Sequence, residues 1–390
     1  MPAGIVCEFN PFHNGHKYLL EKARETAGGP VVCAMSGDFV QRGQTACAPK
    51  EERAKWAVEN GADLVFETPF PFSCASAESF ARGAVSILCK SGLCDTLVFG
   101  VEDESLCPKD FFDIAEILLD KKTEGGINRV LDKNKNLGYA RARSVYISEK
   151  FGEEKAKLLN LPNCLLGVEY AKAILFLGEN TDIITVPRKG ALHDGTPSGE
   201  FSSASWLREN FSKDGAERFC PKQTALYIKD NGISRLDKEK LYAALSAKLL
   251  YSSPQDIAKI AEVPWEYGEK LKKAVQKCKS YDEFFDSLKA KHIPDAKLRR
   301  MMIFILSDIE KEDLSMLPEA AFLLGFSNDS GKFLRKIKKE NENFTVLSKI
   351  SDIKNLGDTQ KKLFEKALCA QKLFERLCVT HKISELDIEK

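Results

Sequence analysis

The chain has 390 residues, of which 43% are hydrophobic and 29% charged, so it is too apolar to be disordered and long enough for two domains. Its 58 Lys and Arg nearly balance its 57 Asp and Glu, and this excludes a strongly basic coat for nucleic acid but leaves local basic patches open. The N-terminus shows no basic segment followed by an apolar run. We therefore expect no signal peptide and a soluble, cytoplasmic protein with no membrane contact.

The first 190 residues alternate between short apolar runs and helical patterns. Predicted strands lie at 4–9, 31–35, 63–67, 95–100 and 183–186, and predicted helices lie at 16–27, from Pro49, and over about 75–91. Strands that alternate with helices at this spacing predict a parallel sheet with right-handed crossovers. We expect the α/β class, with a Rossmann-like nucleotide-binding domain over residues 1–219.

Lysine-rich helical patterns dominate from about residue 220. They lie at 238–251, 296–309 and 361–377, and the run at 344–347 is the one candidate strand. We therefore predict a mostly helical second domain over residues 220–390.

The twelve cysteines follow neither a metal-site nor a disulfide pattern. No Cys-x-x-Cys pair occurs, and the five histidines form no cluster with zinc-ligand spacing. Cys7 and Cys33 lie in apolar runs, where a free cysteine acts as a small hydrophobic residue. We expect no metal bound by protein ligands. Mg²⁺ can accompany a nucleotide, but no carboxylate pattern here points to it.

The strongest motif is EFNPFHNGH at residues 8–16, between the first predicted strand and the first predicted helix. A loop in this position offers free N–H groups and a positive helix end to a phosphate. His13 and His16 can donate hydrogen bonds as charge builds on a phosphate during displacement, and Gly15 lets a nucleotide approach the backbone. The alternative is a turn with two surface histidines, but the strand–helix context favours a catalytic phosphate site.

A second polar group follows the last predicted strand. Arg188 and Lys189 come directly after that strand, and the segment 202–208 places Ser203 as a helix cap ahead of Arg208. Guanidinium and ammonium groups at these positions can bind the β- or γ-phosphate. A simple helix cap explains the serines alone, but after His-x-Gly-His we expect Ser203 to hold the triphosphate and Arg208 to act in catalysis.

These motifs resemble those of the bacterial tRNA(Met) cytidine acetate ligase family, a branch of the His-x-Gly-His nucleotidyltransferases. The strings that carry the resemblance are GIVCEFNPFHNGHKYLL, MSGDFVQRGQTA, NGADLVFETP, LVFGVED, LPNCLLGVEYAKAI, FSSASWLREN and LLGFSNDSGKFLRKIKK. The resemblance implies that ATP and acetate form acetyl-adenylate and pyrophosphate. The acetyl group then passes to N4 of the wobble cytidine of elongator tRNA(Met), which becomes N4-acetylcytidine.

The resemblance also implies the residues that bind ATP. By matching motifs they are Val6, Cys7, Glu8, Phe9, Asn10, Pro11, Phe12, His13, Asn14, Gly15, His16, Lys17, Tyr18, Leu19, Gly100, Asn163 and Arg188. Two positions depart from the family pattern, since Asp38 and Cys164 stand where the family has Asn.

Two further groups are expected near the substrates. The loop after the second predicted strand carries Asp38, Gln41 and Arg42, which we expect to contact acetate or tRNA; an ordinary polar loop is the alternative. Candidate contacts with tRNA phosphates are Arg299, Arg300, Lys332, Arg335, Lys336, Lys338 and Lys339. Only the stretch 332–339 is more basic than a typical solvated helix face.

Two other functions remain open on the sequence alone. A small-molecule adenylyltransferase would share the nucleotide motifs but would leave the helical second half without a task. An ATP-gated RNA-binding module would not need the full set of catalytic side chains. No motif points to a protein partner.

Overall fold

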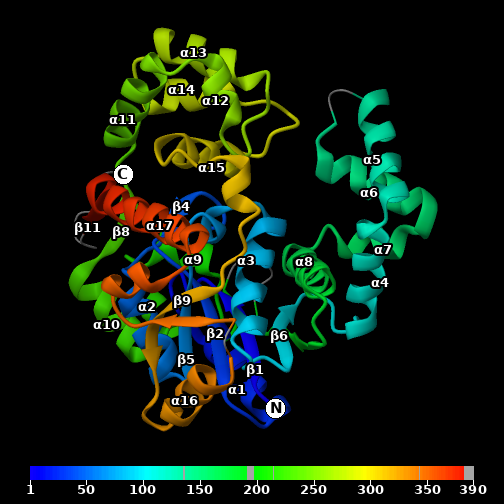
Figure 1. The fold of residues 1–390 in the computed structure, drawn as a ribbon, viewed down its shortest axis with the longest axis vertical. Coiled ribbons are helices and arrows are strands. Elements are labelled where there is room, and N and C mark those ends of the chain that lie inside the picture. The colour runs from blue at the N-terminus through cyan, green and yellow to red at the C-terminus, as the bar shows by residue number, and fades with distance from the viewer. Residues whose placement is uncertain (135–136, 191–196, 214, 342, 382–390) are drawn as a thin grey trace.

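The structure is a computed structural model that describes residues 1–134, 137–190, 197–213, 215–341 and 343–381. Seven strands form one sheet in the order β10-β9-β5-β2-β1-β6-β7 (Figure 1). These strands are β1 (Ala3–Cys7), β2 (Val31–Ser36), β5 (Leu64–Thr68), β6 (Thr96–Val101), β7 (Asp182–Pro187), β9 (Ala320–Phe326) and β10 (Thr345–Leu347). The first five are mutually parallel, while β9 runs antiparallel to β5 and parallel to β10. The predicted α/β class is confirmed.

Helices cover both faces of the sheet. One face packs against α1 (Asn14–Ala27), α2 (Lys50–Glu59), α9 (Ala204–Asn210) and α10 (Lys222–Asn231), and the other against α3 (Ala77–Lys90), α4 (Pro108–Leu119), α8 (Pro162–Leu177) and α16 (Gly331–Glu340). Neighbouring side chains of β2 divide between the two cores: Val31 and Cys33 join one, and Val32 and Ala34 the other. Burial on both faces explains why the strands read as continuous apolar runs.

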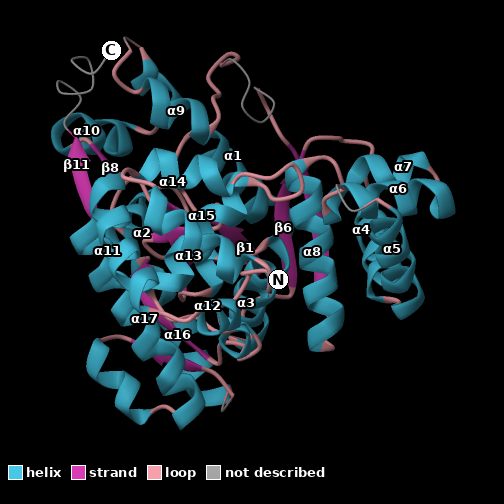
Figure 2. Ribbon diagram, turned by 90° about the horizontal axis from the view of Figure 1, so that it is seen from above, coloured by secondary structure: helices cyan, strands magenta, loops and turns pink. Residues whose placement is uncertain are grey.

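Two helical parts extend from the sheet. The arm consists of α4 with α5 (Lys121–Lys133), α6 (Tyr139–Phe151) and α7 (Glu153–Leu158), and it projects to one side (Figures 1 and 2). The upper helices have a core of their own and comprise α11 (Lys238–Tyr251), α12 (Pro254–Lys259), α13 (Tyr267–Lys277), α14 (Tyr281–Leu288), α15 (Asp295–Leu306) and α17 (Asp358–Leu377). Phe39 and Phe70 from the first half belong to this core as well.

Two short antiparallel pairs complete the strands of the described residues. β3 (Phe39–Val40) pairs with β4 (Gln44–Thr45), and β8 (Ile233–Leu236) pairs with β11 (Cys378–His381). No helix of the described ranges is both long and apolar enough to cross a membrane.

The central sheet uses residues from both sides of position 220. The strand at 344–347 is confirmed as β10, but β9 is absent from the sequence prediction. Its segment AAFLLGF is an uninterrupted apolar run, which periodicity alone does not distinguish from a buried helix. The domain boundary near residue 220 stays a prediction. β9 lies beyond this position and pairs directly with β5, which lies before it, so the central sheet includes strands from both sides of the predicted boundary.

Candidate active site

The loop between β1 and α1 has an unusual backbone. Phe9 has a φ of 47°, in the left-handed region that bulky residues rarely occupy. Its ring is buried and meets the ring of Phe12 at 4.9 Å and that of His16 at 5.0 Å. Such strain costs on the order of 1–3 kcal/mol and persists where packing enforces it. The aromatic cluster therefore fixes the loop under the two histidines.

His13 and His16 form a stacked pair at the start of α1. Their ring centroids lie 3.7 Å apart with an angle of 20° between the planes. His13 Nδ1 accepts a hydrogen bond from Gly15 N at 3.0 Å, and His16 Nδ1 accepts one from His13 N at 3.3 Å. Because each Nδ1 is an acceptor, the neutral rings carry their protons on Nε2. Both rings can then donate Nε2–H to an anion.

Both histidines are held neutral. Burial, followed by the charges of Arg188 and Arg208, lowers the pKa of His13 from 6.5 to about 3. Burial and the neighbouring His13 lower the pKa of His16 well below its usual value. Near neutral pH, therefore, neither ring repels the other by charge.

Gly15 packs against the ring of His13 and also lines the cavity, and the expected approach of a nucleotide to it stays a prediction. A Cβ at this position would lie 2.9 Å from Cε1 of His13, a distance that real Cβ contacts essentially never show. Any larger residue at position 15 would therefore clash with the imidazole that caps the helix. This packing alone is enough to explain the glycine.

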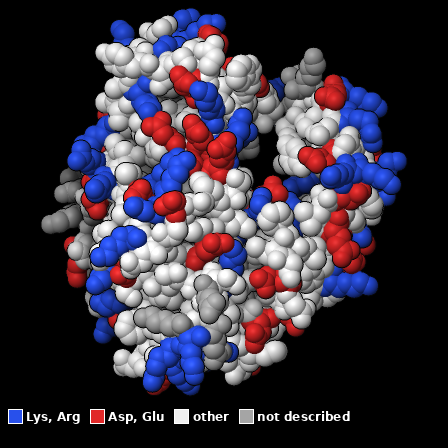
Figure 3. All heavy atoms as spheres, viewed as in Figure 1, with Lys and Arg blue, Asp and Glu red and all other residues white. Residues whose placement is uncertain are grey.

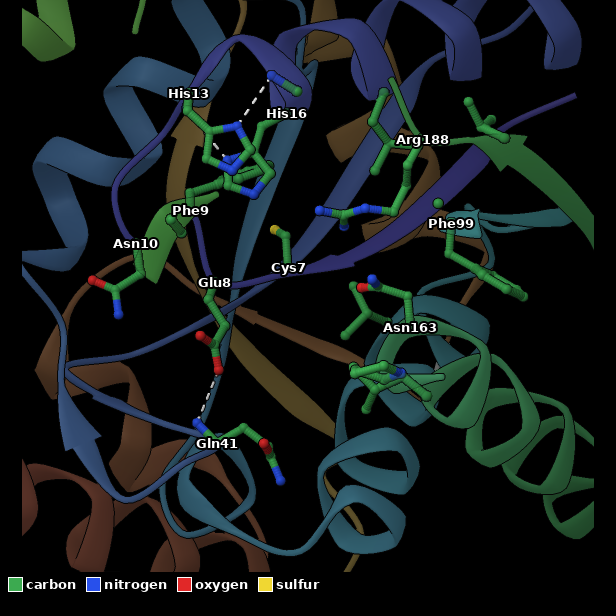
Figure 4. A pocket seen from close by; sticks show the side chains of 18 of the residues that line it. Cys7, Glu8, Phe9, Asn10, His13, His16, Gln41, Phe99, Asn163 and Arg188 are labelled. Carbon is green, nitrogen blue, oxygen red and sulfur yellow. Dashed lines mark hydrogen bonds between the residues drawn. The ribbon is translucent and has the colours of Figure 1, made fainter. Parts of the chain in front are cut away.

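A cavity of about 380 Å³ opens at this loop, along the carboxyl edge of the parallel strands (Figure 4). From the segment 6–19 it is lined by Val6, Cys7, Glu8, Phe9, Asn10, His13, Gly15, His16, Tyr18 and Leu19. Of the other predicted residues, Gln41, Arg42, Gly100, Asn163 and Arg188 also line it. The structure thus brings together predicted residues from five separate segments of the chain. Its size lies within the range typical of small-molecule sites.

Other predicted ATP-binding residues do not line the cavity. Pro11, Phe12, Asn14, Lys17 and Ser203 are not among the described residues that face it. Phe12 is fully buried in the aromatic cluster, and Asn14 donates to the carbonyls of Glu200 and Arg218. Ser203 caps α9 by accepting a hydrogen bond from Trp206 N at 3.1 Å.

Arg208 holds the loop from outside the cavity. Its Nη1 donates to the carbonyl of Asn10 at 2.5 Å, and its Nη2 lies 3.5 Å from Ser205 Oγ. Arg208 is not among the lining residues in the described ranges. Its positive charge acts on His13 at close range, since it contributes to the lowered pKa of that ring.

Glu102 organises the side of the cavity formed by α8. Its carboxylate accepts hydrogen bonds from N and Nδ2 of Asn163, at 2.9 and 2.6 Å, and from N and Sγ of Cys164, both at 3.2 Å. Burial raises the pKa of Glu102, but these hydrogen bonds outweigh it and lower the pKa overall. Cys164 therefore supplies a side-chain donor to Glu102, as an amide at that position could.

The hairpin of β3 and β4 carries Gln41 and Arg42 to the cavity, and the upper helices hold its turn. Arg300 donates to the carbonyl of Gln41 at 3.4 Å, and Arg299 donates to the carbonyl of Arg42 at 3.1 Å. Gly43 has a φ of 68°, and a Cβ there would lie 2.6 Å from Arg300 N. The turn thus fits against α15 only with glycine at this position.

Several residues predicted to contact acetate or tRNA lie elsewhere. Asp38 is buried beside the ion pair of Lys50 and Glu67 and is not among the described lining residues. Arg300 is also buried, and its guanidinium binds Glu262, with Nη2 at 2.6 Å from Oε2. Arg299 is half-buried.

The basic stretch on α16 is not brought to the cavity. Lys332, Arg335, Lys336 and Lys339 are exposed, and the side chain of Lys338 lies outside the described part of the structure. Because β9 runs antiparallel to β5, α16 follows at the amino edge of the parallel strands, opposite the cavity (Figure 1).

Some lining residues could not be found from sequence motifs. Phe80 on α3 and Tyr170 on α8 close the apolar side of the cavity, and their spacing gives no signal beyond that of core residues. Ser202 lines the cavity, and its buried hydroxyl has no hydrogen-bond partner among the described residues.

Arg53 supports the cavity from behind its lining. It is fully buried and donates to the carbonyls of Glu8, at 2.7 Å, and Ser36, at 3.0 Å, which ties the ends of β1 and β2 together.

The described residues contain no group of three or more His, Cys, Asp or Glu side chains that could hold a metal ion. All twelve cysteines are free. The residues that line the cavity can act on a phosphate through the imidazole donors, the N-terminus of α1 and the charges of Arg188 and Lys189.

Known proteins resemble the chain along nearly its whole length. A family model described as HIGH Nucleotidyl Transferase matches residues 2–388. Two relatives named tRNA(Met) cytidine acetate ligase, from Streptococcus pneumoniae strains ATCC 700669 / Spain 23F-1 and Taiwan19F-14, are each 36% identical over 338 residues, 86% of each chain. Crystal structures of Thermotoga maritima TmcAL, apo and bound with alpha-thio ATP, match with TM-scores of 0.86 and 0.84. Both are 25% identical and cover 98% of both chains.

Proposed function

The chain belongs to the HIGH nucleotidyl transferase family and, within it, to the tRNA(Met) cytidine acetate ligases, and we propose that it acetylates a cytidine of tRNA(Met) with ATP and acetate. The acetate carboxylate attacks the α-phosphorus of ATP, pyrophosphate leaves, and acetyl-adenylate remains bound. The acetyl group then passes to N4 of the wobble cytidine, and AMP is released.

The stacked pair of His13 and His16 is the observation that carries this proposal. Both rings are neutral, both carry Nε2–H, and both lie at the N-terminus of a fourteen-residue helix in a cavity of suitable size. Neutral donors can bind the α-phosphate before and during displacement and need not give up a proton. Such donors stabilise charge as it develops on phosphate oxygens, and this is the main demand of phosphoryl chemistry.

The cavity also offers suitable partners for the rest of the nucleotide. Arg188 and Lys189 follow β7 and line the cavity, where they can hold the pyrophosphate part. Arg188 points toward the histidines (Figure 4), and Lys189 Nζ lies 4.6 Å from the centroid of the Tyr18 ring. Phe99 and Asn163 lie on the same side of the cavity (Figure 4), and Gly100, next to Phe99 in the chain, also lines it. We assign the adenosine to this side. The structure of Thermotoga maritima TmcAL bound with alpha-thio ATP supports a nucleotide in this fold.

Acetate-dependent exchange of labelled pyrophosphate into ATP tests the first step without tRNA. We expect exchange to require acetate, and a His16→Asn variant to lose it. Exchange without acetate, or transfer of AMP to a phosphorylated metabolite, would instead indicate a small-molecule adenylyltransferase.

Contacts with tRNA phosphates require cations that are exposed or line the cavity. Arg42 at the cavity and the exposed residues of α16 are candidates for phosphate contacts, at opposite edges of the sheet. Arg300 is better assigned to holding the hairpin turn, because its guanidinium is buried against Glu262.

A further inference from the structure

Glu8 is expected from the family resemblance to lie at the ATP site, but the steps proposed above give its carboxylate no role. Among the described residues that line the cavity, Glu8 is the only carboxylate, and the cations are Arg42, Arg188 and Lys189. ATP and acetate are both anions, so a carboxylate beside them is unfavourable unless it meets a hydrogen-bond donor. Glu8 therefore points to a substrate that brings an N–H or O–H group.

The backbone and side chain of Glu8 are both fixed. Its carbonyl accepts from Arg53 Nη1 at 2.7 Å, and its Oε1 accepts from Gln41 N at 2.9 Å. Gln41 N is the one hydrogen-bond donor that the described residues give to this carboxylate, so Oε2 remains open. In Figure 4 the side chain points away from the histidine pair and toward Gln41, at the other end of the cavity.

The carboxylate thus lies apart from the groups suited to phosphate. His13, His16 and Arg188 surround one end of the cavity, and Glu8 and Gln41 lie at the other (Figure 4). Asp38 cannot serve in its place, since it is buried beside Lys50 and Glu67, outside the described lining.

We propose that Glu8 binds the N4 amino group of the target cytidine and removes its proton during acetyl transfer. This proposal rests on the proposed function. The amino group is the hydrogen-bond donor on the base-pairing edge of cytosine, and a carboxylate is the side chain that accepts from it. Glu8 both selects the cytosine and serves as a general base, because N4 becomes a good nucleophile only as it loses a proton.

The transfer step balances with the groups in the cavity. N4 forms a bond to the carbonyl carbon of acetyl-adenylate, and the bond from that carbon to the phosphate oxygen breaks. AMP leaves with the electron pair of that bond. The N4 proton moves to Oε2 of Glu8 and passes from there to solvent as the product departs. The histidines and Arg188 stabilise the phosphate as it leaves.

Gln41 acts as a positioning residue in this arrangement. Its backbone N–H orients Glu8, and its carbonyl is held by Arg300, whose charge is paired with Glu262. Three consecutive contacts therefore connect the upper helices to Glu8. They join Glu262 to Arg300, Arg300 to the Gln41 carbonyl, and Gln41 N to the Glu8 carboxylate.

The test is to measure adenylation of acetate and transfer of the acetyl group separately in Glu8→Gln and Glu8→Ala variants. Exchange of pyrophosphate measures adenylation of acetate, and a single turnover with excess enzyme, ATP, labelled acetate and tRNA(Met) measures transfer. Gln keeps an oxygen that accepts from Gln41 N and thus preserves the hairpin contact. Glu78→Gln is the matched control, because Glu78 lies beside the lining residue Ala77 but has a side chain 56% exposed.

We expect Glu8→Gln to keep exchange within about threefold of wild type and to slow transfer by about 10²- to 10⁴-fold, the usual range for a general base. Glu78→Gln should affect neither. Equal loss of exchange and transfer, or a raised KM for ATP, would overturn the proposal by placing Glu8 on the nucleotide. Unchanged transfer would overturn it as well. A wild-type enzyme that performs neither half-reaction would instead contradict the proposed function.

Discussion

The two histidines of the first loop combine a structural and a catalytic role. His13 caps α1 through Nδ1 and presents Nε2 to the cavity, and His16 completes the capping box by accepting from His13 N. Asn can cap the helix through its side-chain oxygen, but it has no ring N–H to present to the cavity.

We expect His13→Asn and His16→Asn each to lower the rate of acetate-dependent pyrophosphate exchange by about 10²- to 10³-fold, as loss of one transition-state donor does. Stability should change by less than about 1 kcal/mol for His13→Asn, because Asn is a good N-cap. Steady-state exchange and urea unfolding measure the two effects. A rate within tenfold of wild type would contradict the donor role.

The lowered pKa values also predict a pH dependence of stability. Folded His13 stays neutral down to about pH 3, whereas in the unfolded chain it binds a proton below about 6.5. Above pH 6.5 the ring therefore has no effect, and below it stability falls as the unfolded state takes up the proton. At pH 5 the loss is about 2 kcal/mol for His13.

Urea unfolding between pH 7.5 and 5 tests this dependence. The wild type should lose more stability than His13→Asn over this range, because the variant has no titrating ring at position 13. Parallel curves for the two proteins would contradict the assigned protonation state.

At the scale of elements, the hairpin of β3 and β4 depends on α15. Arg300 is buried, pairs with Glu262 and reaches the carbonyl of Gln41, and Glu262 Oε1 also accepts from Ser76 N at 2.8 Å. The ion pair thus joins the upper helices to both the hairpin and the start of α3. Removing one partner leaves the other charge buried and unpaired.

We expect Glu262→Ala to destabilise the protein by about 3–5 kcal/mol, as loss of one partner of a buried pair does. Glu269→Ala is a suitable control, since Glu269 and Lys273 form an exposed pair at 3.9 Å and such pairs contribute about 0–1 kcal/mol. Urea unfolding measures both. Equal losses in the free energy of unfolding for the two substitutions would show that the buried pair stabilises the protein no more than the exposed pair does.

Most strands of the central sheet could be predicted from the sequence. Alternating apolar runs predicted β1, β2, β5, β6 and β7, because buried parallel strands leave a strong pattern. The prediction failed for β9, whose apolar run fits a helix equally well and whose partner β5 lies more than 250 residues earlier. Pairing over such a distance leaves no local signal.

The same limit applies to the site. The strand–helix context identified His13, His16 and Arg188, and the resemblance to the ligase family added Gly100 and Asn163; all five line the cavity. Sequence motifs could not distinguish residues that line the cavity from residues behind the lining. Ser203, expected to hold the triphosphate, caps α9, and Arg208, expected to act in catalysis, donates to the carbonyl of Asn10. That distinction depends on side-chain direction, which only the fold determines.

At the scale of the whole molecule, the 58 Lys and Arg nearly balance the 57 Asp and Glu. Figure 3 shows Lys and Arg interspersed with Asp and Glu, with no single basic face on the side in view, and a deep hollow between the arm and the upper helices. The arm and these helices touch at Gly138 and His292, where a Cβ on Gly138 would lie 3.1 Å from the His292 carbonyl oxygen. Because the net charge is only +1, we expect a tRNA to be held by local groups of cations.

We expect the affinity for tRNA to fall with salt, with a slope of log K against log salt of roughly −0.7 to −0.9 per phosphate contacted. Combined Ala substitution of Lys332, Arg335, Lys336 and Lys339 tests the predicted contacts of α16. If α16 binds tRNA, the slope becomes shallower while pyrophosphate exchange stays unchanged. An unchanged slope would remove α16 from the tRNA surface and leave the contacts to groups near the cavity, such as Arg42.

The central claim is that the enzyme joins acetate to a cytidine of tRNA(Met) at the expense of ATP. Mass spectrometry of nucleosides from tRNA(Met), after incubation with the protein, ATP and isotopically labelled acetate, tests it directly. We expect labelled N4-acetylcytidine that requires both ATP and acetate and is lost in His16→Asn. Unmodified cytidine, while the protein is folded and binds ATP, would contradict the claim.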